Sequence, residues 1–255
     1  MRRSALVLLL ALAAPARGAG WDAAVRHARA YADARAGSVA FAVIDNRGRM
    51  HGSRIHAPWF SASLLKPVIL GTYLNRPDVR GRPLTREERR LMEPMIRASA
   101  DDPASTLFVR LTPARIQRWG HRHGLTTFHV AAPIWGSTII TPGGYARFFR
   151  HLPEDIPPRH RIFARRLLQT IIPSQRWGTP PVKPRGWKLL FKGGWRAGRG
   201  DGRIVNQAAR LECGTRRITL TILTDRDPSH VYGTKTVRGV AKRLLAPIRS
   251  RRCRA

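Results

Sequence analysis

A serine and a lysine three residues apart are the first candidates for chemistry in this sequence. Ser63 and Lys66 lie in the segment Phe60–Pro67, where a helix is expected to start. At this spacing their side chains share one face of the helix, one turn apart. A lysine whose pKa is lowered by burial or by neighbouring cations can accept the serine proton, which makes the hydroxyl a nucleophile toward a carbonyl carbon. The pair is short and common, so by itself it indicates no particular enzyme.

Two other segments carry groups that such a nucleophile would need around it. In the first, Lys192 is followed by Gly193 and Gly194 at the end of a strand-like run. A lysine beside glycines can present a cation and accessible backbone N–H groups to an anionic substrate, because no side chain blocks a close approach. In the second, Ser99 and Asp101 lie in a short connection between two expected helices. Three separate segments therefore offer a hydroxyl, two amines and further polar groups that the fold would have to bring together.

Taken in order, the three segments resemble the motifs of the class A β-lactamase and penicillin-binding protein-like serine hydrolase superfamily. That family has S-x-x-K at a helix start, S-x-N between two helices and K-[ST]-G on a strand at a sheet edge, and the resemblance spans most of the chain. It implies that Ser63 is the acylated nucleophile, that Lys66 accepts its proton and that Ser99 passes a proton to the leaving nitrogen. The implied reaction is attack on an amide carbonyl through a covalent acyl-enzyme.

The resemblance also implies a substrate-binding edge. Lys192 would hold the substrate carboxylate and raise the local positive potential, with Gly193 and Gly194 beside it. The backbone N–H groups of Ser63 and Trp195 would form the oxyanion hole. Loss of one such donor from an acyl-transfer enzyme costs on the order of 3 kcal/mol of transition-state stabilisation.

Three positions depart from the family pattern. Asp101 stands where the family has an asparagine, and an ionised carboxylate accepts hydrogen bonds but cannot donate them. It can instead pair with Lys66 or Lys192, which would raise the pKa of that lysine. Gly193 replaces a Ser or Thr hydroxyl. The omega-loop glutamate that activates the deacylating water has no counterpart, since the segment 103–153 contains no Asp or Glu, so we expect slow deacylation.

The hydrophobic pattern predicts the elements that position these segments. A helix is expected over 21–36, followed by a hairpin with strands at 38–45 and 49–55. Helices broken by Gly and Pro are then expected at 63–75, 85–98, 103–111, 113–122, 142–151 and 159–171. Three strand-like runs follow from Trp187 onward (WKLLFK, RIVNQAARLEC and RRITLTILTD), and a helix over 234–245 closes the chain.

This order predicts an α+β fold. We expect a five-stranded antiparallel sheet with the N- and C-terminal helices on one face and an inserted all-helical block on the other. No strand–helix alternation supports a doubly wound parallel sheet. Residues 20–255 would form one β-lactamase-like domain, with its sheet part at 20–58 and 186–255 and its helical part at 59–185.

The N-terminus has the layout of a secretory signal peptide. Two arginines at positions 2 and 3 precede an apolar run over 5–14, and small residues suited to cleavage follow. This run is about ten residues long, half of the roughly 20 needed to cross a bilayer. We therefore expect residues 1–19 to be removed and the protein to be secreted, into the periplasm or the extracellular space.

Charge narrows the choice of partners. The chain has 47 Lys and Arg against 15 Asp and Glu, a formal net charge of +32. The arginines are dispersed along the chain, whereas nucleic-acid-binding proteins usually cluster them on one element. Such a surface allows electrostatic association with an anionic cell envelope. We expect a monomer whose partner is a small-molecule β-lactam or a peptidoglycan peptide, and no nucleic acid.

Metal and cofactor sites are not indicated. His121, His123 and His129 form a loose group with no carboxylate nearby, unlike a zinc site, and we expect no cofactor. Cys213 and Cys253 are an even pair in a compartment that permits disulfides, so a bridge and two free thiols both remain open. Tryptophans at 135 and 177 are expected to anchor loops, either by packing beneath a cleft or by stacking on a ligand.

Three functions are compatible with these residues. The first is a secreted serine hydrolase that forms an acyl-enzyme on Ser63 and hydrolyses the amide of β-lactams or related cell-wall peptides. The second is a peptidoglycan D,D-carboxypeptidase-like enzyme with the same nucleophile. The third is a catalytically impaired protein that binds a cell-envelope ligand, which Asp101 and the missing glutamate would permit.

Overall fold

The computed structural model describes residues 19–198, 200–249 and 253. The expected signal peptide therefore lies outside the described residues except for Ala19, where the first helix begins. Within the described ranges, no helix combines the length and the apolar character needed to cross a membrane.

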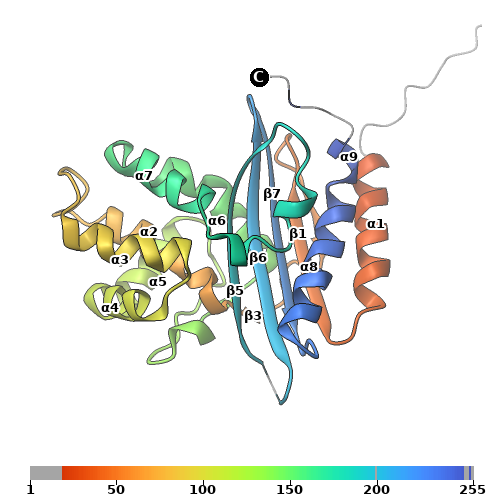
Figure 1. Ribbon diagram of the computed structural model, residues 1–255, viewed down its shortest axis with the longest axis horizontal. Helices are drawn as coiled ribbons and strands as arrows, with labels where there is room; N and C mark the ends of the chain where they lie inside the picture. The colour runs from red at the N-terminus through yellow and green to blue at the C-terminus, as the bar shows by residue number, and fades with distance from the viewer. Residues whose placement is uncertain (1–18, 199, 250–252, 254–255) are drawn as a thin grey trace, which may run out of the picture.

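A five-stranded antiparallel sheet separates two layers of helices (Figure 1). Its strands are β1 (Ser38–Ile44), β2 (Met50–Ser53), β5 (Lys188–Ala197), β6 (Arg203–Cys213) and β7 (Arg216–Asp225), in the spatial order β2-β1-β7-β6-β5. Because β1 pairs with β7, the N-terminal hairpin and the C-terminal strands form one sheet. The expected α+β fold is confirmed, and β5 lies at the sheet edge.

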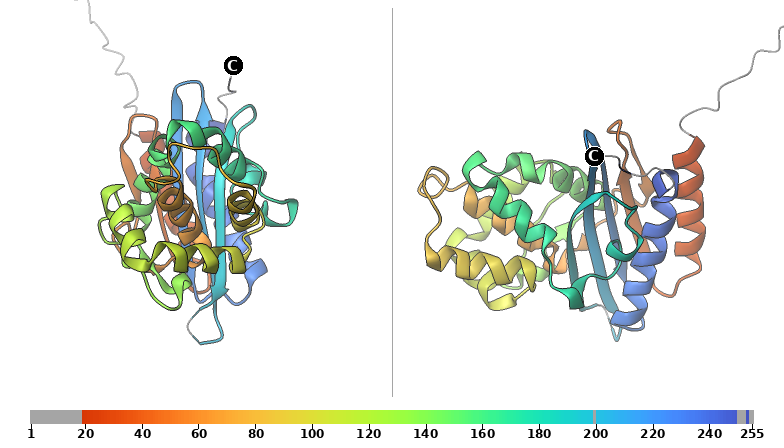
Figure 2. Two further views of the ribbon diagram at one scale, coloured as in Figure 1. Left: turned by 90° about the vertical axis from the view of Figure 1, so that its left-hand side faces the viewer. Right: turned by 45° about the horizontal axis from the view of Figure 1, so that its top comes forward.

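The terminal helices cover one face of this sheet. They are α1 (Ala19–Asp33), α8 (His230–Leu244) and the short α9 (Ala246–Arg249), with α1 packed against α8 (Figure 2). The helical block on the other face consists of α2 (Leu65–Leu74), α3 (Arg86–Arg97), α4 (Asp101–Leu111), α5 (Pro113–Arg122), α6 (Pro142–Asp155) and α7 (Pro158–Gln169). Of these, α6 packs on β1 and β7 and connects the block to the sheet.

Capping side chains fix several helix starts. Thr85 accepts a hydrogen bond from the Glu88 backbone N–H at 3.2 Å, and the Glu88 carboxylate accepts one from the Thr85 N–H at 2.7 Å. This reciprocal pair satisfies two backbone donors that the first turn of α3 would otherwise leave free. Ser229 caps α8 by accepting from the Tyr232 N–H at 3.1 Å. Helix α8 therefore begins at 230 and not at the expected 234.

The structure corrects two further boundaries that concern the site and adds two short strands. The helix expected at 63–75 is a 3-10 turn, Ala62–Leu64, followed by α2, so Ser63 precedes the regular helix. The strand expected to end at Lys192 continues to Ala197, because β5 pairs with β6 over its whole length. Two short strands that the hydrophobic pattern does not indicate, β3 (Trp59–Phe60) and β4 (Ile139–Ile140), pair with each other beside the turn.

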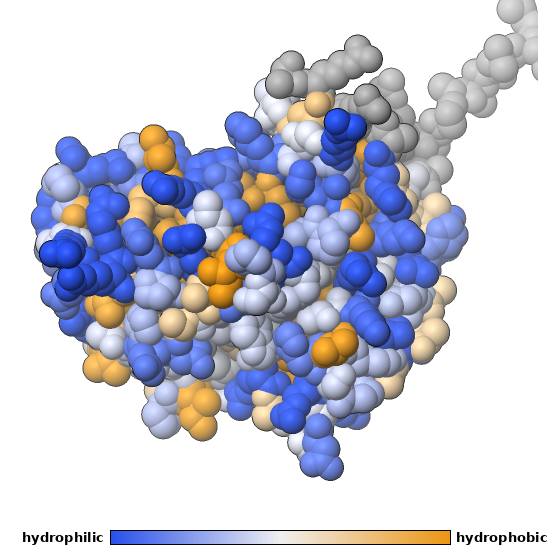
Figure 3. Space-filling view, in the orientation of Figure 1, coloured by the Kyte–Doolittle hydropathy of each residue, from blue (hydrophilic) through white to orange (hydrophobic). Residues whose placement is uncertain are grey.

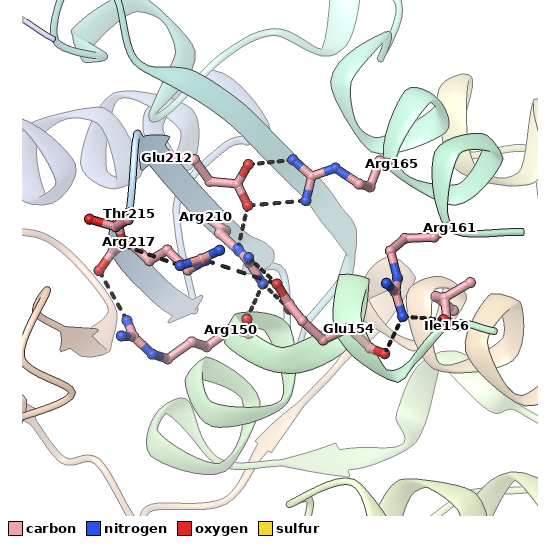
Figure 4. A network of polar contacts seen from close by, with 9 residues as sticks. All are labelled: Arg150, Glu154, Ile156, Arg161, Arg165, Arg210, Glu212, Thr215 and Arg217. Carbon is pink, nitrogen blue, oxygen red and sulfur yellow. Dashed lines mark hydrogen bonds and ion pairs between the residues drawn. The ribbon is translucent and has the colours of Figure 1, made fainter. Parts of the chain in front are cut away.

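A buried arginine connects the helical block to the sheet (Figure 4). Arg210 of β6 is fully buried, and its guanidinium donates to the Glu154 carboxylate of α6 at 2.5 and 2.6 Å. Glu212 lies 2.7 Å from the Arg210 Nε and also accepts from Arg165 of α7 at 3.1 Å. Glu154 thus lies within α6, not after it as expected. The ion pair with Glu154 compensates the buried charge of Arg210, which would destabilise the fold if it had no partner.

The two cysteines form a disulfide. Cys213, at the end of β6, is bonded to Cys253, and their Cα atoms are 5.6 Å apart. Of the two alternatives open for this pair, the structure contains the bridge. It joins Cys253 to the end of β6.

Candidate active site

Ser63 lies in a turn that is held by hydrogen bonds from the sheet and from α6. The 3-10 turn Ala62–Leu64 is buried, with Ser63 only 7% exposed. Asn206 of β6 donates to the Phe60 carbonyl just before the turn at 2.8 Å. Tyr145 of α6 donates to the last carbonyl of the turn. The nucleophile candidate is therefore presented by rigid elements and not by a loose loop.

Strand β5 runs directly against this turn. A Cβ atom at Gly194 would lie 2.9 Å from the backbone nitrogen of Ser63 and 3.0 Å from that of Leu64. Only glycine therefore allows β5 to lie this close to the turn. Trp195 follows immediately, and it lines the same cavity as Ser63. The backbones expected to supply the two oxyanion-hole donors are thus side by side.

Two lysine amines converge on Ser99. The Lys66 amine donates to the Ser99 carbonyl and lies 3.3 Å from the Ser99 Oγ, while Lys192 donates to the same Oγ at 2.7 Å. Both lysine residues are fully buried. Ser99 itself has φ 57°, a left-handed conformation that is uncommon for a residue with a side chain. The fold therefore brings Ser99 into contact with Lys66, which is 33 positions away in the sequence, and with Lys192, which is 93 positions away.

Asp101 pairs with Lys66 and not with Lys192. Its Oδ1 accepts a hydrogen bond from the Lys66 amine at 2.6 Å. The carboxylate is 73% exposed, whereas the amine has no exposed surface. The Ser63 hydroxyl forms no hydrogen bond to any described residue. The hydrogen bonds of the Lys66 amine go to Ser99 and Asp101.

Burial lowers the pKa of both lysine amines, and Asp101 opposes this effect at Lys66. Removal from water lowers the pKa of Lys66 below its ordinary value of 10.5, although the hydrogen bond and charge of Asp101 raise it. The pKa of Lys192 is lowered well below its ordinary value, first by burial and then by the neighbouring Lys66 charge. Two buried amines at one hydroxyl disfavour double protonation. The pair can therefore supply a neutral amine, which is what a proton acceptor requires.

A cavity of about 270 Å³ lies in front of Ser63. Of the described residues that line it, Asp101 carries the only carboxylate and Arg196 the only cation. Lys192 lies behind this lining, fully buried, and its amine is held by Ser99 and by the Gly193 carbonyl at 2.7 Å. The exposed positive charge in the cavity thus belongs to Arg196, which the sequence does not distinguish from the other arginines.

Both tryptophan loops contribute to the site. The Lys66 amine lies 5.1 Å from the centre of the Trp135 ring, a distance typical of a cation–π contact, and Trp135 also lines the cavity. Trp177 packs against β5, where a Cβ atom at Gly193 would lie 2.7 Å from its Cζ2. The ring occupies the space that a Ser or Thr side chain would need at this position. This contact is the physical reason for the glycine.

Metal ligands are not gathered in the described part of the chain. No group of three or more His, Cys, Asp or Glu side chains there could hold a metal ion. His121 contacts the Phe128 carbonyl at 2.9 Å and His123 contacts the Trp119 carbonyl at 2.7 Å, so these rings are used in packing around α5.

The sheet, the inserted helical block and the position of the Ser63 turn define the fold of the class A β-lactamases. A β-lactamase from Sphaerobacter thermophilus superposes with a TM-score of 0.76 over 88% of this chain and 96% of its own, at 14% identity. One from Xanthomonas campestris pv. campestris gives 0.75 over 91% and 98%, at 17% identity. An ancestral class A β-lactamase gives 0.73 over 87% and 98%, at 18% identity. No family model and no curated protein sequence matches the chain.

Proposed function

We propose that the protein is a serine hydrolase that forms an acyl-enzyme on Ser63 and hydrolyses the amide of β-lactams or related cell-wall peptides. The observation that carries this proposal is the convergence of Lys66, Ser99 and Lys192 beside the cavity into which Ser63 opens. Asp101 connects the two parts, since it lines the cavity and accepts from Lys66. The shared fold supports the proposal but does not by itself assign an activity.

Acylation follows from these contacts. Neutral Lys66 accepts the Ser63 proton as the oxygen attacks the carbonyl carbon, and the negative charge on the carbonyl oxygen is stabilised by the backbone N–H groups of Ser63 and Trp195. The C–N bond then breaks. Ser99 passes a proton to the leaving nitrogen and recovers one from Lys66, which lies 3.3 Å from its Oγ.

Substrate recognition in this proposal gives different roles to two basic side chains. Lys192 is fully buried and hydrogen-bonded to Ser99, so it orients the proton relay. Arg196 lines the cavity and is held by a hydrogen bond to the Ser137 Oγ at 2.6 Å. We assign the direct contact with a substrate carboxylate to Arg196, because a guanidinium binds a carboxylate through two parallel hydrogen bonds.

Deacylation requires a base for the attacking water. Asp101 is the only carboxylate among the described cavity residues, and it is engaged by Lys66. A long-lived acyl-enzyme is therefore expected. This observation favours, as a second candidate, a penicillin-binding D,D-carboxypeptidase-like enzyme over a fast β-lactamase.

Covalent labelling tests the proposal. The protein is incubated with a fluorescent penicillin, and the adduct is located by mass spectrometry of the digested protein. A penicilloyl group on Ser63, absent from Ser63→Ala, is expected for both enzymatic candidates. No label in the wild type would leave a binding protein with this fold.

The lifetime of the label separates the candidates. Loss within seconds, with hydrolysed penicillin accumulating, indicates a β-lactamase. A label that persists for hours, together with release of D-alanine from a peptide ending in D-Ala-D-Ala, indicates the carboxypeptidase-like enzyme. The matched control is Ser61→Ala, a buried serine two residues away whose hydroxyl donates to the Ala62 carbonyl at 3.2 Å.

Export belongs to the same proposal. The N-terminal pattern at 1–19 supports removal of a signal peptide and secretion, where cell-wall substrates are found. Expression of the full chain in a bacterial host followed by N-terminal analysis tests it. A mature protein that begins near residue 20 in the exported fraction is expected, and an intact Met1 in the cytoplasmic fraction would contradict export.

A further inference from the structure

A second cavity lies at the opposite end of α2 from Ser63. It has a volume of about 460 Å³ and lies between the C-terminal end of α2, the segment that follows it and α5. Ser63 precedes the first residue of α2, whereas Thr72 and Asn75 of this cavity are at its last turn. Ten helical residues span about 15 Å, so the two cavities are separate. The volume is in the range of small-molecule sites.

Arginine dominates the lining of this cavity. Five of its ten lining residues are arginine (76, 80, 115, 118 and 122), against 41 of 255 in the whole chain. None of the described Asp and Glu residues lines it. Arg115, Arg118 and Arg122 follow one another at helical spacing on α5, so they form one charged stripe of about two turns. Much of the surface of the helical block is hydrophilic (Figure 3). The high share of arginine distinguishes this cavity from the rest of that surface, where basic residues are dispersed.

The charges in the cavity are largely uncompensated. Arg76 pairs with Asp78 at 2.7 Å. Among the described residues, the other four arginines form no ion pair and no side-chain hydrogen bond. These four arginines are exposed, and a hollow lined by one sign of charge focuses the electric field and raises the local concentration of counter-ions. The arrangement therefore favours a ligand that brings several negative charges.

The other polar side chains that line the cavity are those of Thr72, Asn75, His123 and Trp119, and the first three each contact a backbone carbonyl. The Thr72 hydroxyl donates to the Val68 carbonyl at 2.7 Å, and the Asn75 amide donates to the Gly71 carbonyl at 2.9 Å. Trp119 lines the cavity, is 3% exposed, and its indole N–H has no partner among the described residues. Guanidinium and indole groups donate and cannot accept. A matching ligand must therefore be rich in acceptors as well as negatively charged.

We infer that this cavity, which we call the arginine cavity, binds a chain of phosphate groups. Phosphate oxygens only accept, and each phosphate matches the two parallel donors of a guanidinium. A row of phosphates also matches a stripe of arginines along one helix better than a single anion does. The phosphates can be joined as phosphoanhydrides, as in inorganic polyphosphate, or as phosphodiesters, as in poly(glycerol phosphate).

Calorimetric titration of the whole protein tests this inference. Tripolyphosphate is expected to bind at least about tenfold more tightly than inorganic phosphate, since several charge-assisted hydrogen bonds form at once. The stripe is tested by a triple variant, Arg115→Gln, Arg118→Gln and Arg122→Gln. We expect it to bind tripolyphosphate about tenfold or more weakly than the wild type. The affinity of the variant should also depend less on salt concentration between about 50 and 200 mM.

The control removes the same number of charges elsewhere. The control variant carries Arg26→Gln, Arg29→Gln and Arg47→Gln. These exposed residues of α1 and of the β1–β2 turn form no described ion pair. We expect the control to change the affinity for tripolyphosphate by less than twofold. Equal weakening by both triple variants would overturn the inference, as would tripolyphosphate binding no tighter than phosphate. Poly(glycerol phosphate) competing with tripolyphosphate identifies a phosphodiester ligand, and failure to compete identifies a phosphoanhydride one.

Discussion

Asp101 accepts a hydrogen bond from the Lys66 amine at 2.6 Å, while the Ser63 hydroxyl has no hydrogen bond to a described residue. The negative charge opposes the effect of burial on the Lys66 pKa, because it favours the protonated amine. A protonated amine cannot accept the serine proton. In the proposed acylation, Asp101 therefore opposes proton transfer from Ser63 to Lys66.

Replacing Asp101 by asparagine is expected to favour acylation at lower pH. In Asp101→Asn the charge that raises the Lys66 pKa is gone, so burial acts alone and the pKa falls further. The acidic limb of the rate of penicillin labelling should move to lower pH. Rapid-mixing measurements of labelling between pH 5 and 9 would show the shift.

Asp102→Asn is the matched control for this prediction. Asp102 is the next residue, is exposed and forms no side-chain contact with either lysine. It should leave the profile in place. If both variants, or neither, move the acidic limb, the Asp101–Lys66 pair does not control acylation.

Gly193→Thr is expected to destabilise the protein although it restores the hydroxyl found in the family motif. The new Cβ would lie 2.7 Å from the Trp177 ring, and overpacking of this kind costs about 2 kcal/mol. Urea unfolding measures the cost. In a Trp177→Leu background the same Gly193→Thr change should cost much less, and an undiminished cost would show that the ring is not the cause.

Glu212→Gln is expected to reduce the free energy of unfolding by about 3 kcal/mol, since it breaks a buried ion pair. Glu212 is 11% exposed and pairs with both Arg165 and Arg210 (Figure 4). The control is Glu87→Gln. Glu87 is 66% exposed in its pair with Arg110, so less than about 0.5 kcal/mol is expected. Similar losses for the two variants would contradict the assigned role of the buried network.

Asp227 is expected to make the protein less stable as the pH rises. Burial raises its pKa from 3.8 to about 6, although Thr224 donates to it. The folded state then binds more protons than the unfolded state between these values. The free energy of unfolding should therefore fall by on the order of 2–3 kcal/mol between about pH 4 and pH 7 from this group.

The Asp227→Asn variant should lack this pH dependence. Denaturant unfolding across the same pH range measures it, with Asp201→Asn as the control because Asp201 is exposed between β5 and β6. A wild-type stability that rises through pH 6 in parallel with Asp227→Asn would count against the raised pKa.

The long elements of the fold were predictable because each leaves a local pattern, whereas the two-residue strands β3 and β4 do not. Helical and alternating periodicity placed every helix of the inserted block and all five strands of the main sheet, and the strands at both ends of the chain indicated one sheet. Boundaries that depend on caps or on distant partners were missed. The start of α8 depends on Ser229, and the length of β5 depends on its pairing with β6.

The sequence offered candidate residues for the site but not the contacts between them. The three motif segments identified Ser63, Lys66, Ser99 and Lys192 through a family resemblance. The sequence did not indicate the proposed role of Arg196, and it marked Trp177 as a loop anchor without its contact with Gly193. Each depends on which loops the packing places around β5.

By itself, the sequence determined the order of elements, the charge and the segments able to carry acyl chemistry, since these properties reside in neighbouring residues. The tertiary structure decided which lysine Asp101 engages, how deeply Lys192 is buried, and that the two cysteines are bonded. Such contacts join residues tens of positions apart. Their geometry is set by the packing of helices against a sheet, and no local pattern encodes it.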